Sequence, residues 1–109
     1  MNTKDESFKD FVPDQLKDLD GVEARQMFGG FGLYRDEVFF AIVHQGRFYF
    51  KINDVTVGEY RKRRMKPFRP KLRQAIKSYY QVPAEIIEDC DRLHGWAIKA
   101  IGCQTSKRP

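Results

Sequence analysis

The run VFFAIVHQGRFYFKI (residues 38–52) decides the fold class, because it holds two strand patterns joined by a short loop. Residues 38–43 are apolar on both faces, which is typical of a central strand. In residues 48–52 the even-numbered positions are apolar and point one way, the period of a half-buried strand. The loop at residues 44–47 contains a glycine and is too short for a crossover helix, so the two strands are antiparallel.

Further strands are predicted on both sides of this hairpin. Their predicted ranges are residues 22–28, a short strand through Leu33 and Tyr34, residues 65–68 (ended by Pro67 and Pro70) and residues 75–82. A turn is expected at residues 35–37. Residues 29–32 read Gly-Gly-Phe-Gly, which predicts a tight turn or bulge where glycine accepts a positive φ or a close approach of backbone.

Three helices are expected around these strands. The first follows the capping-box pattern of Thr3 and Glu6, with a kink at Pro13, an end at Gly21 and an apolar stripe made of Phe8, Phe11, Leu16 and Leu19. A short helix is predicted from Asn53 or Asp54 to Arg64. The third begins at Pro83 and ends at Gly102, with a stripe made of Ile86, Cys90, Leu93, Ala97 and Ala100 or Ile101. This order predicts an α+β fold of two layers, one antiparallel sheet with helices packed on it.

Length and composition predict one soluble globular domain. The chain has 109 residues, 41% hydrophobic and 32% charged, which excludes a disordered, collagen-like or membrane-spanning protein. We expect the domain to cover residues 1–103 and residues 104–109 to form a disordered tail. No apolar stretch follows residues 1–6, so we expect no secretory signal, a cytoplasmic location, and reduced thiols at Cys90 and Cys103.

A basic segment stands out from an otherwise acidic chain. Between residues 60 and 84 there is no acidic residue, and the basic ones are Arg61, Lys62, Arg63, Arg64, Lys66, Arg69, Lys71, Arg73 and Lys77. Such a segment fits an acidic protein partner or a polyanion such as nucleic acid. Phe68, Tyr79 and Tyr80 lie among these charges, as stacking groups do in single-strand binders. Charges of this kind also protect strand edges against pairing.

The run MFGGFGLYRD (residues 27–36), followed by Phe40 and Ala41, resembles the TfoX/Sxy N-terminal domain family. A second run, SYYQVP (residues 78–83), precedes Trp96-Ala97 in the family's order. The residues of the first motif are Met27, Phe28, Gly29, Gly30, Gly32, Leu33 and Tyr34. The resemblance implies an α+β domain similar to type III secretion chaperones, here as a single-domain member. It also implies a role in regulating competence genes, with the transcription machinery or the cyclic-AMP receptor protein as partner.

The sequence contains no pattern of catalytic, cofactor-binding or metal-ligating residues. The dinucleotide fingerprint would need a glycine after Gly30 and Gly32 at position 35, where the chain has Arg35. Cys90 and His94 are four residues apart, but two ligands make no zinc site, and a buried thiol explains Cys90 better. His44 is expected to be solvated in its loop. We therefore expect no enzymatic activity and no cofactor.

The sequence favours a non-enzymatic regulatory module that acts through protein contacts. A homodimer, formed through a sheet edge or through Phe31, Phe39 and Tyr49, is one such contact. The alternative is a nucleic-acid-binding protein that uses residues 61–77; no membrane partner is expected. Because nine Phe must be accommodated, we also expect the ring of Phe31 in the core, although it lies between two glycines.

Overall fold

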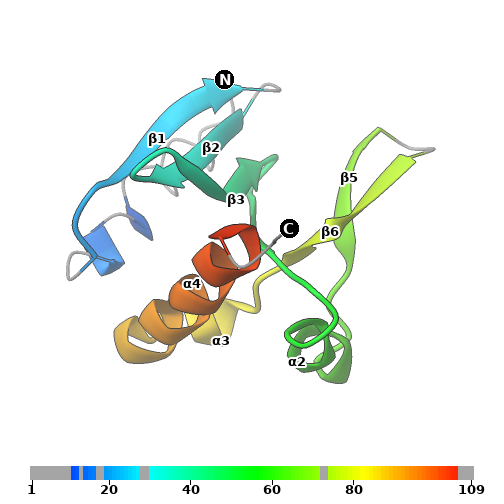
Figure 1. Ribbon diagram of the computed structural model, residues 1–109. Helices are drawn as coiled ribbons and strands as arrows, with labels where there is room; N and C mark the ends of the chain where they lie inside the picture. Colours follow the sequence, from blue (N-terminus) through cyan, green and yellow to red (C-terminus); the bar gives the residue numbers. More distant parts are fainter. Residues whose placement is uncertain (1–10, 13, 17–18, 28–29, 72–73, 106–109) are drawn as a thin grey trace.

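The protein folds as one antiparallel sheet with helices, as expected (Figure 1). The computed structural model describes residues 11–12, 14–16, 19–27, 30–71 and 74–105. Its elements are β1 (Val22–Met27), β2 (Gly30–Arg35), β3 (Val38–His44), β4 (Arg47–Lys51), α2 (Val57–Lys62), β5 (Pro67–Lys71), β6 (Gln74–Gln81), α3 (Ala84–Ile87) and α4 (Cys90–Thr105). The strand order is β1-β2-β3-β4-β6-β5, and every neighbouring pair is antiparallel. This architecture confirms the α+β prediction.

Two tight hairpins fix the register at the centre of the sheet. The turn between β2 and β3 has positive φ at Asp36 (50°) and Glu37 (71°), and the turn between β3 and β4 has it at Gln45 (49°) and Gly46 (77°). Positive φ at both central residues matches the right-handed twist of the flanking strands. The predicted turn at residues 35–37 and the predicted hairpin at residues 38–52 are therefore confirmed.

Gly30 has one of the two roles expected of it, a close approach of backbone, and not the other, a positive φ. The strand β2 begins at Gly30 rather than at Leu33, and neither Gly30 nor Gly32 has a positive φ. A Cβ at Gly30 would overlap the carbonyl oxygen of Val43 and would lie 3.2 Å from the Cα of His44. The glycine is required because the β3 backbone passes close to it, not because the chain turns there.

The main core lies between the sheet and the helices. Fully buried Phe40, Phe48 and Phe50 on the central strands pack in one cluster with Leu93 and Ala97 of α4. The helix α4 packs mainly on β3 and β4, and Figure 1 shows it on one side of the sheet with its C-terminal end near β3. Phe31 is 6% exposed and belongs to this cluster, as predicted.

A smaller aromatic cluster covers the other face of the sheet. Its buried members are Ile42, Tyr49, Phe68 and Tyr79, and Ile42 and Tyr49 alternate along their strands with residues of the main core. The ring of Phe68, from β5, lies 4.9 Å from that of Tyr49 in an edge-on arrangement. Tyr49 is therefore buried as well, so β4 has apolar contacts on both faces.

Proline begins the strand that it was predicted to end. The strand β5 starts at Pro67 and also contains Pro70. It is the last strand of the sheet and pairs only with β6 among the described strands. A residue without an N–H is tolerated on an edge strand, because the outward-facing side makes no ladder hydrogen bond.

The prediction for the N-terminal helix is partly wrong. Residues 1–10 and 13, which include Phe8 and the expected kink, lie outside the described residues. Leu16 and Leu19 are buried as predicted. Phe11, however, is 41% exposed, and Val12 is fully buried in its place.

The C-terminal helix is divided in two and extends beyond its predicted end. Glu88 and Asp89 separate α3 from α4, and the Oδ1 of Asp89 accepts a hydrogen bond from the backbone N–H of Arg92 (3.2 Å). Pro83 precedes α3 in an extended conformation instead of being its first helical residue. Gly102 lies inside α4, which continues to Thr105, so this glycine does not end the helix. A Cβ at Gly102 would meet nothing within 4 Å, so no close contact requires a glycine there.

Candidate functional site

A basic groove lies where the β3–β4 hairpin meets the connection from α2 to β5. Its volume is about 450 Å³, and its lining residues are His44, Gln45, Arg47, Tyr49, Arg64, Met65, Lys66, Pro67, Arg69 and Gln81. Four of them are cationic and exposed, and none is acidic. We call this site the basic groove.

The end of α2 places the basic side chains of the connection in this groove. Arg64 has a φ of +61°, and the backbone N–H of Met65 returns to the carbonyl of Tyr60 at 2.9 Å, which ends the helix sharply. The carbonyl of Lys66 then accepts a hydrogen bond from the N–H of Gln81 (2.9 Å), which ties the connection to β6. Arg64 and Lys66 thus come to lie beside Arg47, which is 17 or more residues away in the chain.

Three of the four cations of the groove make no ion pair with the described residues. Within the described part of the chain, no ion pair involves Arg47, Arg64 or Lys66. Exposed cations at this spacing attract an anion and repel one another when it is absent. The groove can therefore bind a group with several negative charges.

His44 lines the groove and is buried, so the prediction that it is solvated in its loop is wrong. His44 is 8% exposed, and its ring lies edge-on to that of Phe68, with 5.2 Å between the ring centroids. Neither His44 nor Arg47 stood out in the sequence as a site residue, because both belong to a strand hairpin that the basic segment meets only in the fold.

Arg63 is an internal anchor rather than a partner contact. It donates a hydrogen bond to Glu59 (2.8 Å), pairs with Glu85 (3.5 Å) and lies over the ring of Trp96 (5.3 Å). The hydrogen bond to Glu59 is the main reason that the pKa of Arg63 is raised above its usual value. These contacts join α2 to α3 and α4.

We expect Arg63→Ala to lower the thermal unfolding midpoint by a few degrees, because it removes the cation–π contact and both ion pairs together. Arg61→Ala removes the same charge two positions earlier on α2, where the side chain is exposed. That control should leave the midpoint unchanged. Equal effects of the two substitutions, measured by circular dichroism, would contradict the anchoring role.

The remaining basic residues divide between α2 and the β5–β6 hairpin. Lys62 pairs with Glu59 at 3.7 Å, while Arg61 is exposed. Lys71 lies in β5 and Lys77 in β6, but their side chains, and the whole of Arg73, lie outside the described residues. The nine basic residues therefore do not form one surface: Arg64, Lys66 and Arg69 line the groove, and Arg63 does not.

The family motif builds the β1–β2 hairpin. Met27 pairs with Gly30, so Phe28 and Gly29, which lie outside the described residues, connect the two strands. Leu33 is fully buried in the main core. Tyr34 stacks on Phe39 at 5.0 Å, with the guanidinium of Arg25 over its ring at 4.4 Å. In the described part of the motif, the side chains serve packing.

Two of the aromatic residues expected to form a dimer contact are buried within the chain. Phe31 is 6% and Tyr49 is 7% exposed. Phe39 is half-buried and packs against the smaller cluster. The argument for a homodimer from exposed aromatics is therefore wrong for Phe31 and Tyr49, and a dimer through a sheet edge stays a prediction.

The two cysteines form structural contacts with neighbouring residues. Cys90 donates a hydrogen bond to the carbonyl of Gln15 (3.2 Å), and Cys103 is buried with its sulfur 3.8 Å from the Thr56 hydroxyl; both are free. Among the described residues, no three His, Cys, Asp or Glu side chains gather at a metal-binding distance. None of the described helices is both long and apolar enough to cross a bilayer.

The sheet, its helices and the groove define an α+β domain with a concentrated cationic surface. The sequence model of the TfoX N-terminal domain family matches residues 14–104, nearly the whole chain. The protein therefore belongs to the TfoX N-terminal domain family, as the motif at residues 27–36 indicated. A search of curated proteins gave no match.

Proposed function

We propose that this protein is a non-enzymatic regulatory module that binds an acidic segment of a protein partner in the basic groove. The observation that carries the proposal is the meeting of Arg47, Arg64, Lys66 and Arg69 around one cavity that no acidic residue lines. A carboxylate-rich segment could form charge-assisted hydrogen bonds with several of these cations together. The membership in the TfoX N-terminal domain family supports a regulatory role.

A protein partner is favoured over single-stranded nucleic acid because the expected stacking rings are unavailable. Phe68 is fully buried, Tyr79 is 5% exposed and Tyr80 is 9% exposed. A single-strand binder offers exposed aromatic faces to successive bases. In this protein the three rings hold the sheet together instead.

By family resemblance, the partner belongs to the transcription machinery that controls competence genes, with the cyclic-AMP receptor protein as the specific candidate. Such a partner places the protein in the cytoplasm. A protein that acts at a promoter through another protein needs no phosphate contacts of its own. The groove is then the surface that recognises the acidic segment of that partner.

Direct binding to duplex nucleic acid is the second candidate, and the β5–β6 hairpin favours it. Figure 1 shows this hairpin projecting beyond the helices, and Lys71 and Lys77 lie on its two strands. Binding of this kind weakens with salt, with a slope of log K against log salt near about −0.9 per phosphate contacted. An acidic peptide releases far fewer condensed counterions than duplex nucleic acid, so its binding should depend less steeply on salt.

Co-purification from the native cell, with and without nuclease, tests the proposal. We expect a partner that survives nuclease treatment and is lost from the double variant R47S/K66S. The matched variant R61S/K62S removes the same charge from α2, outside the groove, and should keep the partner. Loss of every partner after nuclease treatment would favour the second candidate.

A further inference from the structure

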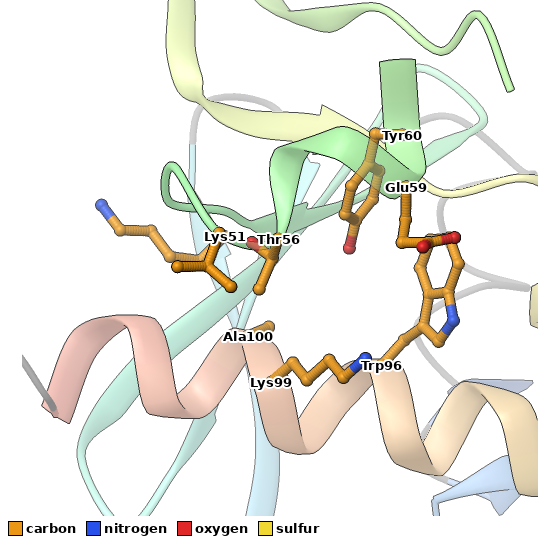
Figure 2. Close-up of a pocket in the computed structure, with 8 residues that line it drawn as sticks. Lys51, Thr56, Glu59, Tyr60, Trp96, Lys99 and Ala100 are labelled. Atoms are coloured by element: carbon orange, nitrogen blue, oxygen red, sulfur yellow. The ribbon is translucent and has the colours of Figure 1, made fainter. Parts of the chain in front are cut away.

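A second cavity lies between α2 and α4, away from the basic groove. Its volume is about 230 Å³, and it is lined by Lys51, Val55, Thr56, Glu59, Tyr60, Trp96, Lys99 and Ala100 (Figure 2). A dry cavity of about 150 Å³ can hold benzene. The space therefore suffices for a ligand of one ring with a short polar arm. We call it the α2–α4 pocket.

The floor of this pocket contains a buried hydroxyl that has no hydrogen-bond partner in the described part of the chain. Tyr60 is 3% exposed, and its ring packs edge-on against Trp96 with 4.8 Å between centroids. Figure 2 shows its hydroxyl oxygen pointing into the space between α2 and α4. Among the described residues no hydrogen bond reaches that oxygen, whereas the hydroxyl of Tyr79 donates to the carbonyl of Phe39 (3.5 Å). An unsatisfied buried hydroxyl is costly, and a ligand acceptor would remove that cost.

The hydroxyl acts as a donor at any physiological pH. Burial raises the pKa of Tyr60 far above its usual value of about 10, so the phenol keeps its proton. A protonated phenol can donate one hydrogen bond, and a carboxylate accepts such bonds strongly.

The charges around the pocket select an anion. Glu59 is engaged by Arg63 at 2.8 Å and by Lys62 at 3.7 Å, which holds the pKa of its carboxyl below the usual range. The ammonium of Lys51 points away from the pocket and lies 5.3 Å from the ring of Tyr79. Lys99 forms no ion pair within the described residues, but its charge also acts on Glu59 and is the smallest of the causes that lower the pKa of that carboxyl. Because Arg63 and Lys62 are the main partners of Glu59, Lys99 is the cation of the lining with which a ligand can pair.

Apart from Thr56, whose hydroxyl accepts a hydrogen bond from the backbone N–H of Asn53 (3.0 Å), the rest of the lining is apolar. The indole of Trp96 is half-buried, Ala100 is buried, and Val55 at the rim is 87% exposed. A pocket with apolar walls and a few convergent polar groups is typical of small-molecule sites. An exposed valine at its rim provides further apolar surface for a ligand to cover.

We propose that the α2–α4 pocket binds a small organic carboxylate with a ring-sized apolar body. The carboxylate accepts a hydrogen bond from the hydroxyl of Tyr60 and pairs with Lys99, and the apolar body packs on Trp96. This site is independent of the basic groove, and its occupant would be a small effector of the regulatory module.

Trp96 is the only tryptophan of the chain, so its fluorescence reports on this pocket alone. The probe is phenylacetate, and the matched neutral control is phenylacetamide. We expect phenylacetate to change the Trp96 emission in a saturable way, with a dissociation constant on the order of 1 mM or below. Phenylacetamide should bind at least about tenfold more weakly.

Two variants locate the contact. Y60F removes one oxygen from a buried ring and should weaken phenylacetate binding about tenfold or more. K99M keeps the aliphatic stem of an exposed residue, so the fold is retained, and it should weaken phenylacetate without changing the affinity for phenylacetamide. The proposal fails if the emission does not saturate up to 10 mM phenylacetate, on the order of ten times the expected constant. It also fails if phenylacetamide binds wild type as tightly as phenylacetate, or if K99M leaves phenylacetate binding unchanged.

Discussion

Replacing Gly30 by valine is expected to lower the free energy of unfolding by about 3 kcal/mol or more. A Cβ at this position overlaps the carbonyl oxygen of Val43 and lies 3.1 Å from the carbonyl carbon, and both atoms belong to the backbone of the central strand β3. Backbone of a paired strand cannot move aside as the end of a flexible side chain can. Overpacking typically costs about 1–3 kcal/mol and more where backbone must shift, against a total stability of about 5–15 kcal/mol for a domain.

Gly95→Ala is the matched control for this substitution. A Cβ at Gly95, in the exposed part of α4, would meet nothing within 4 Å. Alanine there should stabilise the protein by about 0.5–1 kcal/mol, because it favours the helix more than glycine does. Urea unfolding followed by circular dichroism measures both. A Gly30→Val protein with the wild-type midpoint would show that β2 and β3 do not approach so closely.

Phe31→Ala should cost about 3–5 kcal/mol of unfolding free energy, the usual range for a buried phenylalanine. The ring is 6% exposed and belongs to the main core, although it follows one glycine and precedes another. The measurement is the urea midpoint of the variant, with the denaturant slope checked against wild type.

Val55→Ala is the control for Phe31→Ala, since Val55 is 87% exposed. Its effect should stay within about 0.5 kcal/mol. If Phe31→Ala had as small an effect as Val55→Ala, the ring would be dispensable for folding, and the family motif would be better explained as a binding loop.

The parts of the fold that follow from local sequence were predictable. The hairpin at residues 38–52 encodes its strands by apolar pattern and its turn by Gly46, and both signals act over a few residues. The predictions were wrong where the position of a residue in the folded sheet, rather than its neighbours in the sequence, determines its role. Pro67 begins a strand because β5 lies at the sheet edge, and no pattern along the chain shows which strand is an edge.

The roles of the glycines were likewise only partly predictable from the sequence. Gly21 has a φ of +84°, as the end of an apolar segment indicated. Gly30 meets a close approach of β3, the second of the two roles predicted for it, whereas Gly102 was expected to end the helix and meets no steric constraint inside α4. The sequence shows that a glycine is present, whereas the neighbouring backbone shows why.

The basic segment indicated a concentration of positive charge, but it did not show which of its residues share one surface. Arg63 and Arg64 are adjacent, yet Arg63 is the residue that follows α2 and Arg64 has a positive φ, so Arg63 lies over Trp96 and Arg64 lines the basic groove. Arg47 joins the groove from a hairpin that precedes the segment. Only the pairing of β4 with β6 brings these residues together.

Fluorescence anisotropy measures directly whether the basic groove binds an acidic protein segment. A labelled decapeptide of glutamate is titrated with wild type, with R47S/K66S and with R61S/K62S, and an unlabelled duplex DNA of equal charge competes. We expect R47S/K66S to weaken peptide binding about tenfold or more, because two charged contacts are lost. R61S/K62S should stay within about threefold of wild type, since exposed charges outside the groove contribute little. Equal weakening in both variants, or displacement of the peptide by a lower concentration of the duplex than of unlabelled peptide, would contradict it.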